Sequence, residues 1–311
     1  MIETIELTKT FNSKGWSVEA LRGVNFRADR GKITALVGPN GAGKTTIIKI
    51  ISTLVLPTSG HAYVDGWDIV SQAKEVRKKI GLVTVSDRLM YFRLTGLENL
   101  VFYGALYNMG LKEARSKARE LLDTVGLGEW GDQPIMHYST GMLRRLAIAR
   151  ALMHNPDVVL LDEPTLGIDT TSSRRVRQMI RRLAADRTIV LTSHLMKEIE
   201  ELADKIYLIR TGKVISSGTP AEIRSMAGQF AEASVSTENI PTEMEKFVLK
   251  YENGKALIRG PEDKISLLTG EYTAVEPTLE DAYILLAGES TADFRPYQVK
   301  RGGAWGREHP F

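Results

Sequence analysis

The sequence lacks cysteine, lacks long hydrophobic runs and carries little net charge. Its 311 residues include no cysteine, which excludes a disulfide framework and a metal site built on thiolates. The longest apolar stretches, such as 158–161 and 188–192, have the length of strands, whereas a membrane-spanning helix needs roughly 20 residues. The 41 Lys and Arg residues nearly balance the 38 Asp and Glu residues, so the net charge of +3 does not indicate a nucleic-acid partner.

The remaining composition is that of a globular protein. With 43% hydrophobic and 25% charged residues, the chain is long enough for one large domain and a smaller attachment. The N-terminus, Met1 to Glu6, alternates in polarity like a strand. It lacks the basic start and apolar run of a signal peptide, so we expect no cleavage there and a cytosolic location.

Short runs of β-branched residues alternate with helix-period segments as far as about Gly218. This alternation is typical of a parallel sheet covered by helices, and it predicts an α/β fold. We expect buried core strands at 33–37, 80–85, 158–161 and 189–192. We expect antiparallel strands outside this core at 24–28, 62–65, 206–210 and 213–217. From about 95 to 155 the pattern is helical, which predicts an all-helical insertion in a domain of residues 1–220.

The composition changes at Gly218-Thr219-Pro220, and we expect residues 221–288 to form a small α+β accessory domain. Thr278, with Asp281 three residues later, has the pattern of a helix start. Residues 289–311 hold glycines, prolines and scattered charges without periodicity, so we expect a flexible tail.

A glycine-rich segment follows the first predicted core strand and opens an apolar helix. Its glycines allow backbone N–H groups to surround phosphates at a helix N-terminus. Lys44 can reach the β- and γ-phosphates, and the Thr45 hydroxyl can bind Mg²⁺. A glycine-rich turn without function is the alternative, but pattern and context both match a phosphate-binding loop. The ATP-binding residues predicted from this segment are Gly38, Pro39, Asn40, Gly41, Ala42, Gly43, Lys44, Thr45 and Thr46.

A second motif is the apolar run 158–161, which ends in Asp162 and Glu163. Ligands of α/β sheets bind beyond the carboxyl ends of the strands. Asp162 is therefore placed to hold Mg²⁺, and Glu163 to orient and deprotonate a water molecule. An acidic strand end can also serve as a helix cap. The phosphate-binding loop in the same chain favours the catalytic interpretation.

With these motifs the sequence resembles the ABC ATPase family from about Glu3 to Gly218. Between them, Tyr138 to Leu152 resembles the family signature and its helix. From the residues alone, Ser139 and the backbone of Gly141 can form a second anion site at a helix N-terminus. The alternative is an amphipathic helix with an ordinary start. The resemblance implies that four residues close on the γ-phosphate bound by a partner subunit: Ser139, Thr140, Gly141 and Met142.

The signature departs from the common Leu-Ser-Gly-Gly-Gln at three positions. Tyr138 replaces the leucine, Thr140 the first glycine and Met142 the glutamine. Methionine followed by arginines resembles the separate-chain subunits of drug, polysaccharide and ion exporters. We interpret the changes as marks of a subfamily and not as loss of the site.

Three further residues are assigned from the resemblance. Asp169, in the loop after the acidic strand, is similar to the aspartate that communicates across the family dimer. His194 is similar to the histidine that touches the γ-phosphate and the attacking water, although a histidine at a strand end is often structural. Phe11 lies where the family stacks an aromatic ring on adenine, and we prefer it to its rival Trp16. The alternative is that both aromatics are core residues.

One family residue is missing. After the strand that begins at Ile80 the family usually has a glutamine that bridges the metal and the membrane partner, and this segment has none. Ser86 and Asp87 are the candidates to substitute for it, and we assign no metal ligand there. Tyr91-Phe92-Arg93 then lies where the family receives the coupling helix of a permease. Exposed aromatics with arginine are typical of interface anchors, although they can also pack the insertion onto the core.

The resemblance implies a P-loop NTPase (RecA-like) core with an antiparallel β subdomain and the helical insertion. It implies an ATPase that uses ATP and Mg²⁺, with Lys44, Glu163 and His194 in catalysis and with Thr45 and Asp162 on the metal. The expected partners are a second copy or a homologous subunit, and a permease on separate chains at the cytoplasmic face of the membrane. The alternative is a soluble ABC-type ATPase that acts on nucleic acid or ribosomes, but no nucleic-acid partner is expected. The segment around Pro277 resembles the C-terminal extension of drug-resistance exporters, which leaves the cargo open.

Overall fold

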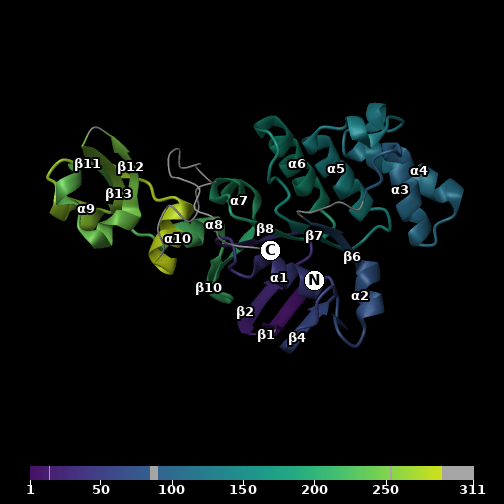
Figure 1. The fold of residues 1–311 in the computed structure, drawn as a ribbon, viewed down its shortest axis with the longest axis horizontal. Helices are drawn as coiled ribbons and strands as arrows, with labels where there is room; N and C mark the ends of the chain where they lie inside the picture. Colours follow the sequence, from purple (N-terminus) through teal and green to yellow (C-terminus); the bar gives the residue numbers. More distant parts are fainter. Residues whose placement is uncertain (14, 85–89, 253, 289–311) are drawn as a thin grey trace. The chain divides into compact units, whose positions relative to one another are not determined.

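The computed structural model describes residues 1–13, 15–84, 90–252 and 254–288 (Figure 1). By their contacts these residues form two compact units. The larger unit contains residues 1–228 and 277–287, and the smaller contains residues 229–276 together with Gly288.

The larger unit is built around a six-stranded sheet with the strand order β10-β9-β3-β8-β7-β6. All neighbouring strands run parallel except β10, which is antiparallel to β9. The strands are β3 (Ile33–Val37), β6 (Ile80–Val83), β7 (Val158–Asp162), β8 (Thr188–Ser193), β9 (Lys205–Arg210) and β10 (Lys213–Gly218). The prediction of an antiparallel strand at 206–210 was therefore wrong in part, because β9 pairs in parallel with β3 and belongs to the core sheet.

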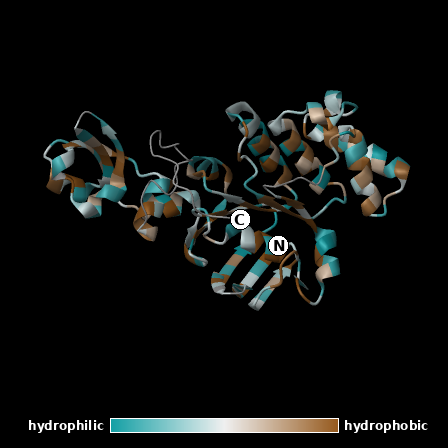
Figure 2. Cartoon of the chain, in the orientation of Figure 1, coloured by the Kyte–Doolittle hydropathy of each residue, from teal (hydrophilic) through white to brown (hydrophobic). Residues whose placement is uncertain are grey.

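The central strands are buried from end to end. Every residue of β3, β7 and β8 is buried, and Figure 2 shows hydrophobic residues along the strands of this sheet. A parallel sheet covered on both faces needs such continuous apolar strands. Asp162 and the residues after β3 and β8 lie at the carboxyl edge of this sheet, where ligands of α/β folds bind.

A second, antiparallel sheet has the order β2-β1-β4-β5. Its strands are β1 (Ile2–Ser13), β2 (Trp16–Ala28), β4 (Ser59–Val64) and β5 (Trp67–Asp68). The helix α1 (Lys44–Ile51) shares one hydrophobic cluster with both sheets through four buried isoleucines, Ile47, Ile48, Ile50 and Ile51. Each buried isoleucine stabilises the fold by about 1.5–3 kcal/mol. The start of α1 is therefore fixed between the two sheets.

Between β6 and β7 the described residues form helices, as expected of the insertion. These are α3 (Gly96–Leu106), α4 (Leu111–Thr124) and α5 (Thr140–Ala151), with short 3-10 turns at Gly128–Trp130 and Ile135–His137. A capping box of Thr95 and Glu98 begins α3. The other helices up to β9 are α2 (Ala73–Lys79), α6 (Thr170–Leu183) and α7 (Met196–Leu202).

The C-terminal helix α10 (Leu279–Ala287) returns to the larger unit. Thr278 begins it as expected, since its hydroxyl accepts the N–H of Asp281 at 3.2 Å. Tyr283 on α10 is fully buried, and α10 contacts α7, β10 and α8 (Pro220–Ser225). The division therefore falls at 228 and 276, not at the expected 220 and 288, because α8 and α10 pack with the larger unit.

The described residues of the smaller unit form an antiparallel sheet and one α-helix, α9 (Glu262–Leu268). The strand order is β12-β13-β11-β14, with β11 (Phe230–Ser236), β12 (Val248–Glu252), β13 (Lys255–Pro261) and β14 (Thr273–Val275). Two 3-10 segments, Thr237–Asn239 and Thr242–Phe247, connect β11 to β12. Its core includes Phe230 and Phe247, both about fully buried. The tail expected at 289–311 lies outside the described residues.

Candidate active site

The loop from Gly38 to Gly43 joins β3 to α1 and approaches other backbone closely. Gly43 has φ +108°, a left-handed conformation that side chains disfavour. A Cβ at Gly43 would lie 2.8 Å from the Ala20 carbonyl oxygen, and one at Gly38 would lie 2.1 Å from that of Ile209. Within this described segment no side chain caps α1. The first N–H groups of the helix are thus left for an anion such as a phosphate.

Lys44, the first residue of α1, is a buried cation held by the loop. Its Nζ donates to the carbonyl oxygens of Gly38 at 2.6 Å and Pro39 at 3.0 Å, and lies 3.8 Å from a carboxylate oxygen of Glu163. Burial lowers the pKa of Lys44, while the nearby Glu163 and Asp162 carboxylates favour the charged form and oppose that shift. An ammonium held in this way can donate to a phosphate that enters the loop.

Asp162, the last residue of β7, connects α1 to β8. Its two carboxylate oxygens accept the Thr45 hydroxyl at 3.0 and 3.1 Å, and Oδ1 accepts the Thr192 hydroxyl at 2.6 Å. Asp162 is 2% exposed, so its orientation is fixed by these bonds. A carboxylate beside a hydroxyl offers the hard oxygen ligands that Mg²⁺ takes when it is shared with a phosphate. The residues present therefore fit a magnesium ion.

Glu163 follows β7, and its carboxylate lies between two basic side chains. One oxygen faces Lys44, and Oε2 is 3.0 Å from Nδ1 of His194. The backbone of Glu163 has φ +49°, which is unusual for a residue other than glycine. Its N–H donates to the Thr192 hydroxyl at 3.0 Å. A buried carboxylate between a cation and an imidazole is placed to accept a proton from water.

Sequence reasoning did not single out Thr192, which holds both acidic residues. Its hydroxyl donates to Asp162 and accepts the N–H of Glu163. It lies in a buried strand, two residues before His194. A hydroxyl-bearing residue in that place is the sequence feature that could have indicated its role. The structure thus brings Lys44, Thr45, Asp162, Glu163 and His194 together around one threonine.

The signature residues and Asp169 form a second group, built by α5 and α6. Ser139 caps α5 by accepting the N–H of Met142 at 3.2 Å, and Thr140 is the first residue of that helix. Asp169 caps α6, and its hydrogen bonds from Ser172 lower its pKa. A Cβ at Gly141 would lie 2.5 Å from the Ser172 hydroxyl oxygen. The starts of the two helices are therefore in direct contact.

The aromatic expected on adenine remains a prediction. Phe11 lies on β1 with Nζ of Lys9 5.0 Å from its ring centre, and its rival Trp16 begins β2. Ser86 and Asp87, the candidates for the place of the family glutamine, lie outside the described residues.

Comparison with known proteins agrees with this geometry. The ABC transporter family matches residues 21–166. The ABC transporter ATP-binding protein NatA of Bacillus subtilis is 37% identical over 70% of this chain and 89% of that protein. The daunorubicin resistance ATP-binding protein DrrA2 of Streptomyces coeruleorubidus is 35% identical over 88% of this chain and 91% of that protein. The chain belongs to the ABC transporter ATP-binding proteins.

A solved structure shares the fold of this ABC ATPase. A dimeric post-hydrolysis state of the ATP-binding cassette MJ0796, bound to ADP and phosphate, superposes with a TM-score of 0.64. The two are 28% identical, and the match covers 70% of this chain and 98% of that one. The expected P-loop NTPase fold is thus confirmed, and the chain binds and hydrolyses ATP as a member of the family.

The structure also explains one departure in the signature of this ABC ATPase. Tyr138 is 7% exposed, and its hydroxyl donates to the Trp130 carbonyl oxygen at 2.7 Å. Burial raises the pKa of Tyr138 to about 12. A Cβ at Gly96 would lie 2.4 Å from the Tyr138 hydroxyl oxygen, so a glycine at the start of α3 makes room for it. Tyr138 therefore joins the start of the signature to the turn at Gly128–Trp130 and to the start of α3 within the insertion. A leucine has no hydroxyl and could not donate this bond.

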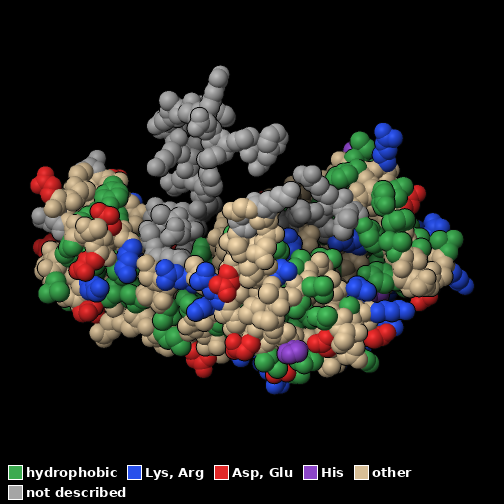
Figure 3. Space-filling view, turned by 60° about the horizontal axis from the view of Figure 1, so that its bottom comes forward, with side chains coloured by type: hydrophobic (Ala, Val, Ile, Leu, Met, Phe, Trp, Pro, Cys, Tyr) green, Lys and Arg blue, Asp and Glu red, His purple; other side chains and the backbone are tan. Residues whose placement is uncertain are grey.

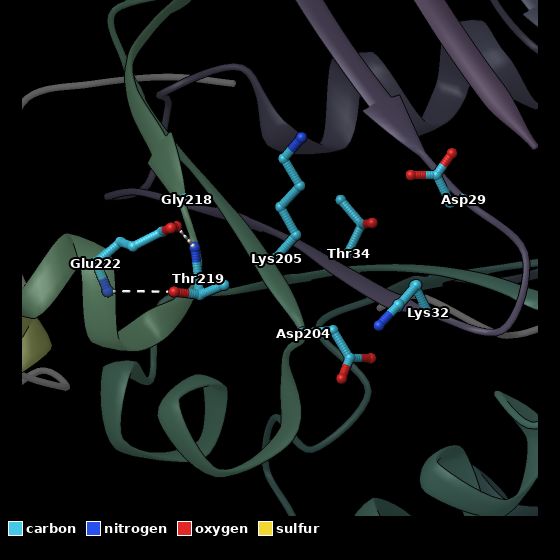
Figure 4. Close-up of a pocket in the computed structure, with 8 residues that line it drawn as sticks. All are labelled: Asp29, Lys32, Thr34, Asp204, Lys205, Gly218, Thr219 and Glu222. Carbon is cyan, nitrogen blue, oxygen red and sulfur yellow. Dashed lines mark hydrogen bonds between the residues drawn. The ribbon is translucent and has the colours of Figure 1, made fainter.

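A cavity of about 200 Å³ lies at the opposite edge of the core sheet, where β3 and β9 begin (Figure 4). Its polar groups serve the fold: Thr219 and Glu222 form a capping box for α8, drawn as dashed lines, and Asp204 accepts the Ile33 N–H at 2.8 Å. The ATP site is at the other edge. The cavity is lined by Asp29, Lys32, Thr34, Asp204, Lys205, Gly218, Thr219 and Glu222.

Proposed function

We propose that this ABC ATPase is the motor subunit of an exporter, and that it closes head to tail on a second copy, or on a homologous subunit, around two ATP molecules. The observation that carries the proposal is the Glu163 carboxylate, held between Lys44 and His194 beside a loop suited to phosphates. This arrangement provides the parts that hydrolysis of a phosphoanhydride requires in one place.

In this proposal each side chain has a distinct task. The loop N–H groups and Lys44 bind the β- and γ-phosphates and offset their charge. Glu163 orients the attacking water and takes its proton, while His194 keeps the carboxylate in place and contacts the γ-phosphate. Thr45 and Asp162 would hold Mg²⁺. When bound, that ion would neutralise charge that develops on the phosphates.

The dimer is supported by the second group of residues. Ser139 and the Gly141 N–H lie at the start of α5, a 12-residue helix, where backbone N–H groups favour an anion. We propose that they contact the γ-phosphate bound by the partner's loop. The contact between Gly141 and Ser172 then links this site to Asp169 at the start of α6.

The permease partner is supported by exposed aromatics and by relatives. Tyr91 and Phe92 are 51% and 52% exposed, and Phe102 packs edge-on against Tyr91 at 4.9 Å between ring centres. Exposed aromatic pairs are typical of interface anchors. No helix among the described residues is long and apolar enough to cross a membrane. Relatives named for daunorubicin resistance favour drug-type export, which would place this subunit at the cytoplasmic face of the membrane beside its permease.

The alternative, an ATPase that acts on nucleic acid or ribosomes, has less support. The face drawn in Figure 3 shows Lys and Arg side chains interspersed with Asp and Glu side chains. A binding surface for nucleic acid concentrates positive charge on one face, and this face mixes both signs. The choice between the two functions rests on the relatives, which are named as transporter and drug-resistance ATP-binding proteins.

Replacing Glu163 by glutamine tests the proposal. The variant keeps the shape of the side chain but cannot accept the proton, so hydrolysis should slow by at least about 10²-fold while ATP still binds. With ATP bound and not consumed, the protein should elute as a dimer in size-exclusion chromatography. Turnover close to that of the unmodified protein would show that Glu163 is not the base.

A further inference from the structure

The loop from Glu163 to Asp169 is held by hydrogen bonds to a carboxylate that is not part of the catalytic cluster. Glu198 lies in the first turn of α7, four residues after His194. One of its oxygens accepts the Thr165 hydroxyl, two residues beyond Glu163, and the other accepts the Ser173 hydroxyl at 2.6 Å. Thr165 is 7% and Ser173 4% exposed, so both contacts are inside the protein.

An arginine completes the arrangement. Arg177 of α6 donates to the Glu198 carboxylate at 2.6 Å and to the Ser173 hydroxyl at 2.7 Å. The Arg177 and Glu198 side chains are 18% and 20% exposed, so water screens the pair only in part. A single carboxylate thereby joins three segments: the loop after Glu163, the first half of α6 and the start of α7.

The backbone at Glu163 shows why this junction matters for hydrolysis. Glu163 has φ +49°, a conformation that costs a non-glycine residue of order 1–3 kcal/mol and persists where the surroundings enforce it. On one side the Glu163 N–H is held by Thr192 at 3.0 Å. On the other side, the side-chain anchor nearest to Glu163 is the bond from Thr165 to Glu198.

We propose that Glu198 is a positioning residue for ATP hydrolysis, which clamps the loop from Glu163 to Asp169 onto α6 and α7 and so keeps Glu163 beside His194. Because α7 begins two residues after His194, the same carboxylate fixes the catalytic base and its imidazole partner relative to each other. The inference rests on the proposed role of Glu163 as the base. It assigns Glu198 no contact with ATP, so its loss acts on turnover and not on binding.

The test is a pair of substitutions that each remove one end of the clamp, Glu198→Leu and Thr165→Val, because neither leucine nor valine can form these hydrogen bonds. Each should lower kcat at least about tenfold and leave KM for ATP within about twofold, because a misplacement of the base by 1 Å can cost 10²-fold in rate. Thr165→Ser, which keeps the hydroxyl, should retain most of the rate. The double variant should be little slower than either single variant, since both remove the same contact.

Glu201→Leu is the matched control. Glu201 lies on the same helix and pairs with the same Arg177 at 3.6 Å, but it is 59% exposed and makes no contact with Thr165. It should keep kcat within about twofold. Unchanged kcat in Glu198→Leu, or multiplicative losses in the double variant, would overturn the proposal. A loss of kcat that is proportional to a loss of melting temperature and of ATP-binding sites would also overturn the proposal. That result is expected if Glu198 only stabilises the fold.

The Glu163→Gln variant shows which of two proposals fails: the role of Glu163 as the base or the positioning role of Glu198. If it turns over normally, the proposed base is wrong and the positioning role falls with it. If it is inactive while Glu198→Leu is normal, the base stands and the clamp alone is refuted.

Discussion

Replacing Tyr283 by alanine tests whether the C-terminal helix α10 belongs to the ATPase unit. Tyr283 is fully buried, and its hydroxyl lies 3.4 Å from the Ile209 carbonyl oxygen in β9. Truncation of a buried aromatic residue to alanine costs about 3–5 kcal/mol. In a unit of this size 1 kcal/mol corresponds to about 2–4 °C, so the melting temperature should fall by about 6–20 °C.

The assay is calorimetric melting with and without ATP, because the transition that ATP raises identifies the unit that binds the nucleotide. Tyr251→Ala is the control, since Tyr251 is 63% exposed on β12 in the smaller unit. It should leave the ATP-responsive transition within about 2 °C. If Tyr283→Ala also leaves that transition within about 2 °C, α10 does not pack in the ATPase unit and the reasoning from burial is refuted.

Two further predictions concern the two halves of the site. Lys44→Ala should abolish most ATP binding measured by calorimetry, because it removes the buried ammonium that the loop holds and that we propose to bind the phosphates. Unchanged affinity would contradict that assignment. Gly141→Ala should lower ATPase activity at least about tenfold while nucleotide affinity stays the same, because its Cβ would lie 2.5 Å from the Ser172 hydroxyl oxygen and force the helix starts apart. Gly110→Ala in the same insertion meets nothing within 4 Å, and it should behave like the unmodified protein.

The phosphate-binding loop and the acidic strand end could be anticipated from the sequence because each is a contiguous motif next to a recognisable strand. Glycines from 38 to 43, followed by Lys44, specify local backbone geometry whatever the rest of the chain does. The carboxyl ends of parallel strands meet at one edge, so Asp162 and His194 were expected near Lys44. The structure brings them there: Asp162 accepts the hydroxyl of Thr45, next to Lys44, and His194 and Lys44 both contact Glu163.

What the sequence could not reveal depends on contacts between distant segments. The strand β9 has the same apolar alternation whether it pairs in parallel or antiparallel, and its pairing with β3 is decided only in the fold. The helix α10 was placed in the accessory domain because it follows that domain along the chain. The buried face of α10 packs against α7, α8 and β10, which precede the accessory strands in the sequence.

The same holds for single side chains. Thr192 has the sequence appearance of an ordinary strand residue, and its role follows from two hydrogen bonds to residues 30 and 29 positions away. Glu198 looks like one of several acids on a short surface helix. Its contact with Thr165, 33 positions earlier, is visible only in three dimensions.

The most direct test of the central claim, that each ATP is hydrolysed between two subunits, is a mixed dimer of one Ser139→Arg chain and one Lys44→Ala chain. If Ser139 serves the partner's ATP, both lesions fall in the same site and the other site is intact. Phosphate release from dimers purified through two tags should then recover part of the activity that each variant homodimer lacks. If Ser139 serves its own chain's ATP, each site carries one lesion. The absence of any recovery in dimers confirmed by size would contradict the account.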